Sequence, residues 1–210
     1  MKDLNNRVAI ITGSSSGVGA ATAKLLAAQG CNVVINYNSN SEGGDAVAAE
    51  CKALGVECLV MGGNVAEDAN CLAMAAAAIE KWGRIDILVN NAGTTKFVDH
   101  WDLHGLSSDD FQHIYGVNVI GSYQMIRAVS EQMQSQEEGG AVVNVASTAA
   151  VTGIGSSVAY AASKGALVTM TLSLARALGP KLRINAVCPG FIEGDWLREG
   201  LGDQKYEELI

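Results

Sequence analysis

The 210-residue sequence predicts an α/β fold, a doubly wound parallel sheet of the Rossmann type. Short apolar runs alternate with Ala-rich stretches of helical spacing along the whole chain. These runs are apolar throughout, as expected for strands covered on both faces. A glycine-rich turn also joins the first run to the first Ala-rich stretch. Right-handed crossovers then favour the strand order 3-2-1-4-5-6.

The elements follow one another without a linker or a composition shift, so a single domain over residues 1–210 is expected. The expected strands are Arg7–Thr12, Asn32–Tyr37, Val56–Met61, Asp86–Asn90, Ala141–Ala146 and Arg183–Val187. The expected helices are Val18–Gln29, Glu42–Leu54, Glu67–Lys81, Asp109–Gln134 and Val158–Leu178.

Composition excludes several classes of protein. Hydrophobic residues make up 49% of the chain, which excludes a disordered protein. The net charge of -8 argues against partners with anionic surfaces, so no nucleic acid and no membrane partner is expected. A small anionic ligand remains compatible, because helix N-termini bind phosphate without net positive charge.

Neither a signal peptide nor an uninterrupted apolar run of about 20 residues is visible, so no membrane span is expected. The five cysteines are odd in number and lack CxxC spacing, which favours buried thiols over a disulfide or metal framework. A cytoplasmic protein is therefore expected.

The segment from Thr12 to Gly19 follows the first expected strand and opens a helix. Gly13 permits a sharp turn, while Gly17 and Gly19 permit close approach of a pyrophosphate. Ser15, Ser16 and Val18 complete a turn whose free amides could bind phosphate. A glycine-rich turn that serves only packing is the alternative interpretation.

The end of the second strand bears on the choice of nicotinamide cofactor. An acidic residue there accepts the ribose hydroxyl of NAD and repels the phosphate of NADP. The sequence has Tyr37, Asn38 and Ser39 at this end, with no carboxylate and no nearby Arg or Lys. NADP(H) is therefore favoured, and NAD(H) stays open.

Tyr160 and Lys164 lie four residues apart in the helix after the fifth strand, so their side chains share one helix face. A phenol has a pKa of ~10, and a nearby ammonium favours the phenolate and lowers that pKa. Ser147 follows the fifth strand directly, where its hydroxyl could polarise a substrate oxygen. By itself, a Tyr-x-x-x-Lys pair is more often a helix surface pair.

Together these motifs resemble the short-chain dehydrogenase/reductase family over essentially the whole chain. The resemblance rests on the Thr12–Gly19 turn, Asn90-Asn91-Ala92-Gly93, Asn118, Ser147, Tyr160-x-x-x-Lys164 and Pro189-Gly190-Phe191-Ile192. Within that family, the chain is most similar to the β-ketoacyl-carrier-protein reductase branch.

The resemblance implies an NAD(P)-dependent oxidoreductase that interconverts a carbonyl and a secondary alcohol by hydride transfer. Tyr160 would be the general acid or base, and Lys164 would lower its pKa and bind the nicotinamide ribose. Ser147 would hold the substrate oxygen, and Asn118 would position a water in the proton relay. The further cofactor contacts it implies are Asn64, Val65, Asn91, Ala92, Gly93, Pro189, Gly190 and Ile192.

The partners expected on this basis are a small carbonyl or alcohol substrate and further copies of the chain, as a dimer or tetramer. Residues 191–210 are expected to begin a substrate lid, and the family's seventh strand is not apparent in the sequence. A non-catalytic dinucleotide-binding scaffold protein derived from the family is the alternative function.

Several aromatic residues could wall an apolar substrate pocket, with ordinary packing as the equal alternative. They are Phe97, Trp101, Phe111, Phe191 and Trp196. His100 and His104 have helical spacing, but solvated histidines are the commoner case and no metal site is expected.

Overall fold

The computed structural model describes residues 4–207, apart from the side chains of residues 195–197 and 205. Six parallel strands form one sheet in the order β3-β2-β1-β4-β5-β6, which confirms the predicted fold class and strand order. The strands are β1 (Val8–Ile11), β2 (Asn32–Tyr37), β3 (Cys58–Gly62), β4 (Ile87–Asn90), β5 (Gly140–Val145) and β6 (Leu182–Val187).

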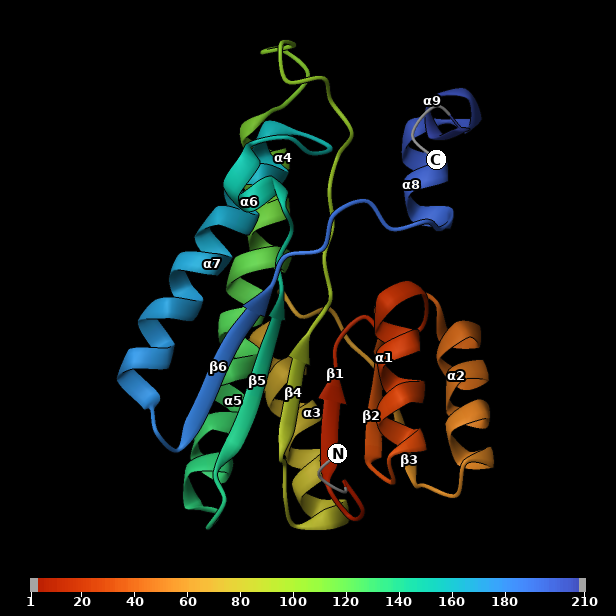
Figure 1. Cartoon of the computed structure of the whole chain (residues 1–210), viewed down its shortest axis with the longest axis vertical. Coiled ribbons are helices and arrows are strands. Elements are labelled where there is room, and N and C mark those ends of the chain that lie inside the picture. Colours follow the sequence, from red (N-terminus) through yellow and green to blue (C-terminus); the bar gives the residue numbers. More distant parts are fainter. Residues whose placement is uncertain (1–3, 208–210) are drawn as a thin grey trace.

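Helices cover both faces of the sheet (Figure 1). Helices α1 (Gly17–Ala28) and α2 (Ser41–Ala53) pack on one face, and α3 (Asp68–Trp82), α5 (Ser122–Ser135) and α7 (Val158–Leu178) pack on the other. The remaining helices are α4 (Ser108–Tyr115), η1 (Gly116–Gly121), α6 (Ala149–Thr152), α8 (Asp195–Leu201) and α9 (Asp203–Glu207).

The central strand β1 shows how the sequence builds this core. All four of its residues are fully buried, and successive side chains point to opposite faces. Val8 and Ile10 join the cluster under α3 and α5, whereas Ala9 and Ile11 join the cluster under α1 and α2. Because both faces are covered, the apolar pattern runs through the strand without alternation.

One expected element differs from the structure. The stretch predicted as a single helix over Asp109–Gln134 contains a π-helical segment, η1, between α4 and α5. The apolar spacing of Gly116–Gly121 resembles that of an α-helix, so the wider turn is not visible in the sequence pattern. Such segments frequently occur at functional sites, and this one contains Asn118.

The side of β5 and β6 opposite α5 and α7 carries no helix within residues 4–207. Figure 1 shows these two strands exposed at the end of the sheet. Val187 of the edge strand β6 is accordingly 47% exposed. No seventh strand is present in the described part of the chain.

Helix α7 is long and apolar enough, by length and composition alone, to cross a membrane. The sequence analysis predicted this helix but not a membrane span, because Lys164, Arg176 and several hydroxyl side chains interrupt the apolar run. Core helices of globular proteins pass the same test, and α7 packs against β6, α4 and α6. The helix therefore gives little support for a membrane span.

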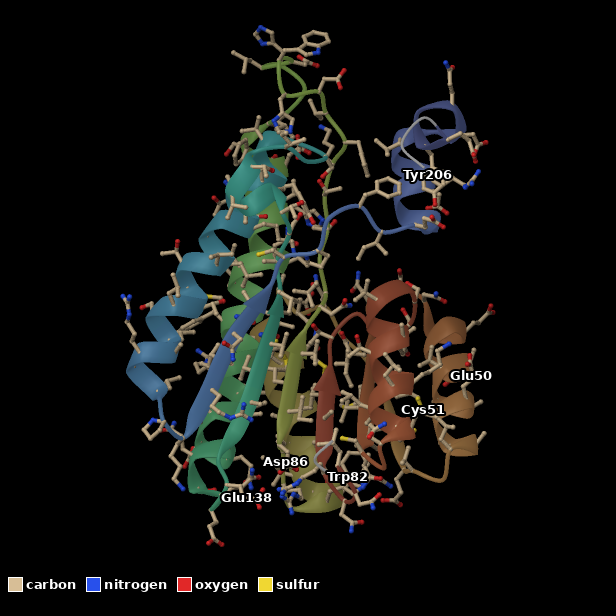
Figure 2. All side chains as sticks on the ribbon, viewed as in Figure 1. Glu50, Cys51, Trp82, Asp86, Glu138 and Tyr206 are labelled. Atoms are coloured by element: carbon tan, nitrogen blue, oxygen red, sulfur yellow. The ribbon has the colours of Figure 1, made fainter. Side chains whose placement is uncertain are left out.

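A cluster of charges closes the amino-terminal edge of the sheet. Asp86 accepts hydrogen bonds from the backbone N–H of Val8 and from Arg7 and Arg84, and Arg7 also pairs with Glu138. Figure 2 shows Asp86 and Glu138 at this edge and Tyr206 beyond the opposite edge. The ion pairs thus lie at the end of the molecule remote from the predicted site.

Candidate active site

The predicted site residues gather at the carboxyl edge of the sheet, where β1, β4 and β5 end side by side. Parallel strands present these ends on one edge, and this edge is where open α/β sheets bind ligands. Helices α8 and α9 lie beyond the same edge (Figure 1).

Hydrogen bonds lock the ends of β1 and β4 together. The hydroxyl oxygen of Thr12 accepts the backbone N–H groups of Asn91 and Ala92, each at 3.0 Å. The Asn91 amide donates to the backbone carbonyls of Thr12 at 2.9 Å and Gly13 at 3.0 Å. Asn91 therefore fixes the start of the glycine-rich turn to the end of β4. Thr12 was not predicted as a site residue, although its position in the sequence, at the end of a strand and before a glycine, could have indicated one.

The glycine-rich turn could hold a phosphate. Gly13 and Gly17 have φ of +61° and +54°, which favour glycine. A side chain on Gly13 would meet Ala92 at 2.9 Å, whereas one on Gly17 would project into open space. Ser16 makes no side-chain cap on α1, which leaves helix-start amides available to a ligand. These residues fit the pyrophosphate of a dinucleotide.

The predicted ribose end of the site lies at the end of β2. Asn36 is buried and fully used inside the fold, accepting from the Gly13 N–H and donating to the backbone oxygens of Tyr37, Met61 and Gly63. The ring of Tyr37 covers Gly62, where an added side chain would meet it at 3.0 Å. The side chains of Asn38 and Ser39 are exposed.

Asn64 and Val65 lie at the end of β3 and approach η1. The Asn64 side-chain oxygen accepts the Ala66 N–H at 3.0 Å, which fixes a tight turn. Val65 is buried against Gly121, where an added side chain would meet it at 2.7 Å. Its carbonyl accepts from Gln124 at 2.8 Å.

Asn118 joins three segments of the site and has no exposed surface. Its side-chain oxygen accepts the Thr94 N–H at 2.8 Å, and its amide nitrogen donates to the Thr94 carbonyl at 3.0 Å. The same nitrogen donates to the Ser163 hydroxyl at 2.9 Å, and Ser163 donates to the Tyr160 carbonyl at 2.7 Å. The Asn118 side chain thus positions the helix that bears Tyr160. The sequence analysis predicted Asn118 only as a residue that positions a water.

Tyr160 lies in the first turn of α7, which Ser157 caps by accepting the Tyr160 N–H at 3.3 Å. The Ser147 side chain lies near the Tyr160 phenol. Burial raises the pKa of the phenol, and the neighbouring Ser147 side chain offsets part of this rise. The spacing of Tyr160 and Lys164 predicted a lowered pKa, so the direction is opposite, because desolvation outweighs the favourable contacts.

Lys164 is only 4% exposed, and its ammonium donates to the Val145 carbonyl at 2.7 Å. The ammonium lies 5.6 Å from the centre of the Tyr160 ring. Burial lowers the pKa of Lys164 to about 8. Gly93 lies beside this ammonium, and a side chain added there would be in ordinary van der Waals contact with it, at 3.6 Å.

A second buried polar chain, which the sequence analysis missed, passes beneath the site. Asn90 of β4 donates to the Asn144 side chain at 2.9 Å and to the Ser122 carbonyl at 3.2 Å. Asn144 of β5 donates to the Thr171 hydroxyl of α7 at 2.8 Å. A buried amide needs hydrogen-bond partners. The signal available in the sequence was therefore an Asn inside each of two apolar strands.

The segment after β6 lies along the Ser147 turn. The Pro189 carbonyl accepts the Thr148 N–H at 2.9 Å, and an added side chain on Gly190 would lie 4.0 Å from Thr148. Ile192 is 43% exposed at the same edge. The structure therefore brings the two ends of the predicted cofactor site to one edge.

Helices α8 and α9 follow and are held together around Tyr206. Its hydroxyl accepts the Gly194 N–H at 3.0 Å, and its ring packs against Phe191 with centroids 5.7 Å apart. Arg198 lies over the same ring at 4.4 Å and pairs with Asp203 and Glu207.

The expected apolar wall is not formed as predicted. Trp101 is 80% exposed in the loop between β4 and α4, and Phe111 is 37% exposed on α4. Phe191 instead packs on Tyr206, and the side chain of Trp196 lies outside the described residues. Phe97 alone among the described aromatics of this set meets α8, where an added side chain on Gly200 would collide with its ring.

Within residues 4–207, no group of three or more His, Cys, Asp or Glu side chains could hold a metal ion.

Comparison with known proteins identifies the family. The sequence profile described as "short chain dehydrogenase" matches residues 7–204. The chain belongs to this family. Its relatives include a 3-oxoacyl-[acyl-carrier-protein] reductase of Synechocystis, 37% identical over 100% of this chain and 83% of the relative.

Two further relatives carry other names. A 3-hydroxyacyl-CoA dehydrogenase type-2 of Rattus norvegicus is 38% identical over 90% of this chain and 75% of its own length. The crystal structure of an NAD+-bound xylitol dehydrogenase superposes with a TM-score of 0.88 at 31% identity, covering 97% of this chain and 77% of that one. The family is therefore shown by sequence and by fold.

The pKa of Lys164 predicts that this residue destabilises the fold at neutral pH. Its folded pKa of about 8 lies below the usual 10.5, so the fold favours the neutral amine and folding costs free energy while the group is charged. The cost is full below pH 8, declines as pH rises to 10.5 and vanishes above it. Lys164→Met should therefore raise the free energy of unfolding by up to about 3 kcal/mol at pH 7.

Urea unfolding of both proteins at pH 7 and pH 10 measures this difference. The advantage of Lys164→Met should shrink at the higher pH, with Lys24→Met, on the surface of α1, as the control. A difference that is the same at both values would contradict the assignment.

Proposed function

We propose that this protein is an NAD(P)-dependent oxidoreductase that interconverts a carbonyl and a secondary alcohol. The buried Lys164 ammonium, 5.6 Å from the centre of the Tyr160 ring, with Ser147 near the same phenol, carries the proposal. Membership of the short-chain dehydrogenase family supports it.

A bound nicotinamide dinucleotide would supply the hydride. The residues proposed to hold it are those of the Gly13–Gly19 turn, Tyr37–Ser39, Asn64–Val65, Asn91–Gly93 and Pro189–Ile192, together with Tyr160 and Lys164. Ser147 holds the substrate oxygen beside the phenol. Tyr160 donates its proton to that oxygen during reduction and removes it during oxidation.

The raised pKa of Tyr160 suits the reductive direction. Burial keeps the proton on the phenol at neutral pH, which is the state that a general acid needs. Lys164 and Asn118 fix the position of α7, and Asn118 acts through Ser163 rather than by contact with substrate. The relatives named as reductases and dehydrogenases of acyl compounds and of xylitol are consistent with both directions.

The general-acid role predicts that Tyr160→Phe lowers kcat/KM for carbonyl reduction by roughly 10²- to 10⁴-fold, because the proton donor is removed. Dissociation constants for NADPH and NADH should change little, since the ring remains. Steady-state kinetics with a panel of ketones, together with cofactor fluorescence titration, measure both quantities.

A non-catalytic dinucleotide-binding scaffold is the alternative. It would bind cofactor normally, and the wild type and Tyr160→Phe would be equally inert on every carbonyl and alcohol of the panel. That result would sink the proposed enzyme activity.

We propose that NADP(H) is preferred to NAD(H). The exposed Asn38 and Ser39 side chains can donate to a ribose phosphate, and residues 37–39 at the end of β2 include no carboxylate that would repel it. Wild type should show a kcat/KM for NADPH several-fold above that for NADH. Asn38→Asp should reverse the preference, because the new carboxylate repels the phosphate and accepts the ribose hydroxyls. A wild type that prefers NADH would overturn this choice.

We propose that the chain forms a single domain on which α8 and α9 are a substrate lid.

We also propose that the protein works as a cytoplasmic homo-oligomer. Phe111, Ile120 and Tyr123 leave apolar surface exposed along α4, η1 and α5, at 37%, 51% and 46% of their areas. Light scattering after gel filtration should give the mass of a dimer or tetramer, and Ile120→Lys should shift it toward a monomer. A monomeric wild type would contradict the proposal.

A further inference from the structure

A pair of thiols lies between α2 and β3, outside the proposed active site. All five cysteines of the chain are free thiols. Cys51 is on α2 and has no exposed surface, whereas Cys58 begins β3 and is partly exposed. Two cysteines can be joined without backbone movement only where their side chains point toward one another, so the faces that carry them are decisive.

Strand β3 directs Cys58 toward α2. Successive side chains of a strand point to opposite faces of the sheet. Leu59 and Met61 pack on the cluster under α3 and α5. Cys58 and Val60 pack on the cluster under α1 and α2, to which Cys51 belongs. Both thiols therefore enter the same layer of the core.

The path of α2 brings Cys51 to the same end of β3. The buried residues of this helix share one face and are Gly44, Val47, Ala48 and Cys51. Near the start of that face, a side chain added to Gly44 would lie 3.2 Å from Val60. Helix α2 connects two parallel strands and so runs opposite to β3. Cys51 is about two turns beyond Gly44, and Cys58 is two residues before Val60, so the two cysteines lie near one another.

The ionisation of the two thiols is consistent with this contact. Burial, followed by the neighbouring Cys58 side chain, raises the pKa of Cys51 to about 11. Burial also raises the pKa of Cys58. Both groups are therefore protonated at neutral pH. Because the thiolate is the reactive form, exchange at this pair is slow.

The other three cysteines have different surroundings. The Cys31 thiol donates to the Arg7 carbonyl at 3.3 Å, and the Cys71 thiol donates to the Val65 carbonyl at 3.3 Å. Both are buried, whereas Cys188 is exposed after β6. Cys31 and Cys71 therefore serve as internal controls for the reactivity of buried thiols.

We propose that Cys51 and Cys58 form a reversible disulfide that cross-links α2 to β3, through exchange with a small-molecule disulfide such as glutathione disulfide. Cys58 reacts first, because its side chain is partly exposed, and the buried Cys51 resolves the intermediate. This modification site is independent of the proposed oxidoreductase function.

The exchange proceeds in two steps. The Cys58 sulfur loses its proton to solvent and attacks one sulfur of glutathione disulfide, whose S–S bond breaks. One glutathione leaves as a thiolate and takes up a proton. The Cys51 sulfur then loses its proton and attacks the Cys58 sulfur, and the second glutathione leaves in the same way. Two protein thiols are oxidised to one disulfide, and one glutathione disulfide is reduced to two thiols.

The sequence allows a direct test by peptide mapping. Cleavage after glutamate residues releases Cys51–Glu57 and Cys58–Glu67, each of which contains a single cysteine. Native protein is incubated for hours at pH 8 with glutathione disulfide, and the remaining thiols are blocked with N-ethylmaleimide in denaturant. We expect mass spectrometry to find these two peptides joined in the wild type and separated by reduction with dithiothreitol.

Variants test the order of the two steps. Cys51→Ala should leave Cys58 as a mixed disulfide with glutathione, because the resolving thiol is absent. Cys58→Ser should leave Cys51 unmodified, because the reagent does not reach the buried sulfur. Wild-type Cys58 that stays free, or stays a mixed disulfide, would overturn the proposal. A linked pair that forms only in urea-unfolded protein would overturn it as well.

Formation of the bond should also stabilise the fold. A disulfide restricts the unfolded chain, so the Tm of the oxidised wild type should exceed that of the reduced protein by about 4–8 °C. The same treatment of Cys58→Ser should give no increase, which controls for glutathione added at Cys188. An unchanged or lower Tm of the cross-linked wild type would show that the bond distorts α2 and would contradict the assignment.

Discussion

The arrangement of the site depends on one buried amide, the side chain of Asn118. Its three hydrogen bonds join the segment after β4, the π segment and α7, and none of them has water as an alternative partner at this depth. An unpaired buried polar group costs roughly 1–3 kcal/mol, so the three segments are held in a single arrangement. Both the loop that begins at Thr94 and the helix that bears Tyr160 take their positions from it.

The carboxyl edge of the sheet and the proposed lid, α8 and α9, are stabilised by separate sets of contacts. The edge carries the glycine-rich turn on strand ends that hydrogen bonds of Thr12 and Asn91 hold together. The lid is stabilised within itself around Tyr206 and meets the rest of the molecule through Phe97 and Gly200. Under the proposed function, the carboxyl edge would carry out hydride transfer, and the loops that face α8 would contribute to the choice among carbonyl compounds.

The sequence predicted the sheet order and the convergence of Gly13, Ser147 and Tyr160 because these depend on local patterns and on topology. Strand runs, glycines at turns and a four-residue helical spacing are all short-range signals. The exposure of Trp101 depends instead on the path of the loop between β4 and α4, which hydrophobic periodicity does not predict. The pKa direction of Tyr160 was missed for a related reason, since desolvation depends on tertiary packing rather than on spacing.

The π segment places a particular limit on change in this protein. A regular helix rotates about 100° per residue, so the extra residue accommodated between α4 and α5 sets the relative phase of the two helices. Deleting one residue from Gly116–Gly121 would restore regular turns but rotate one helix against the other. Asn118 would leave Thr94 and Ser163, or the core residues of α5 would leave the sheet. Substitutions in this stretch are therefore easier to accommodate than any change in its length.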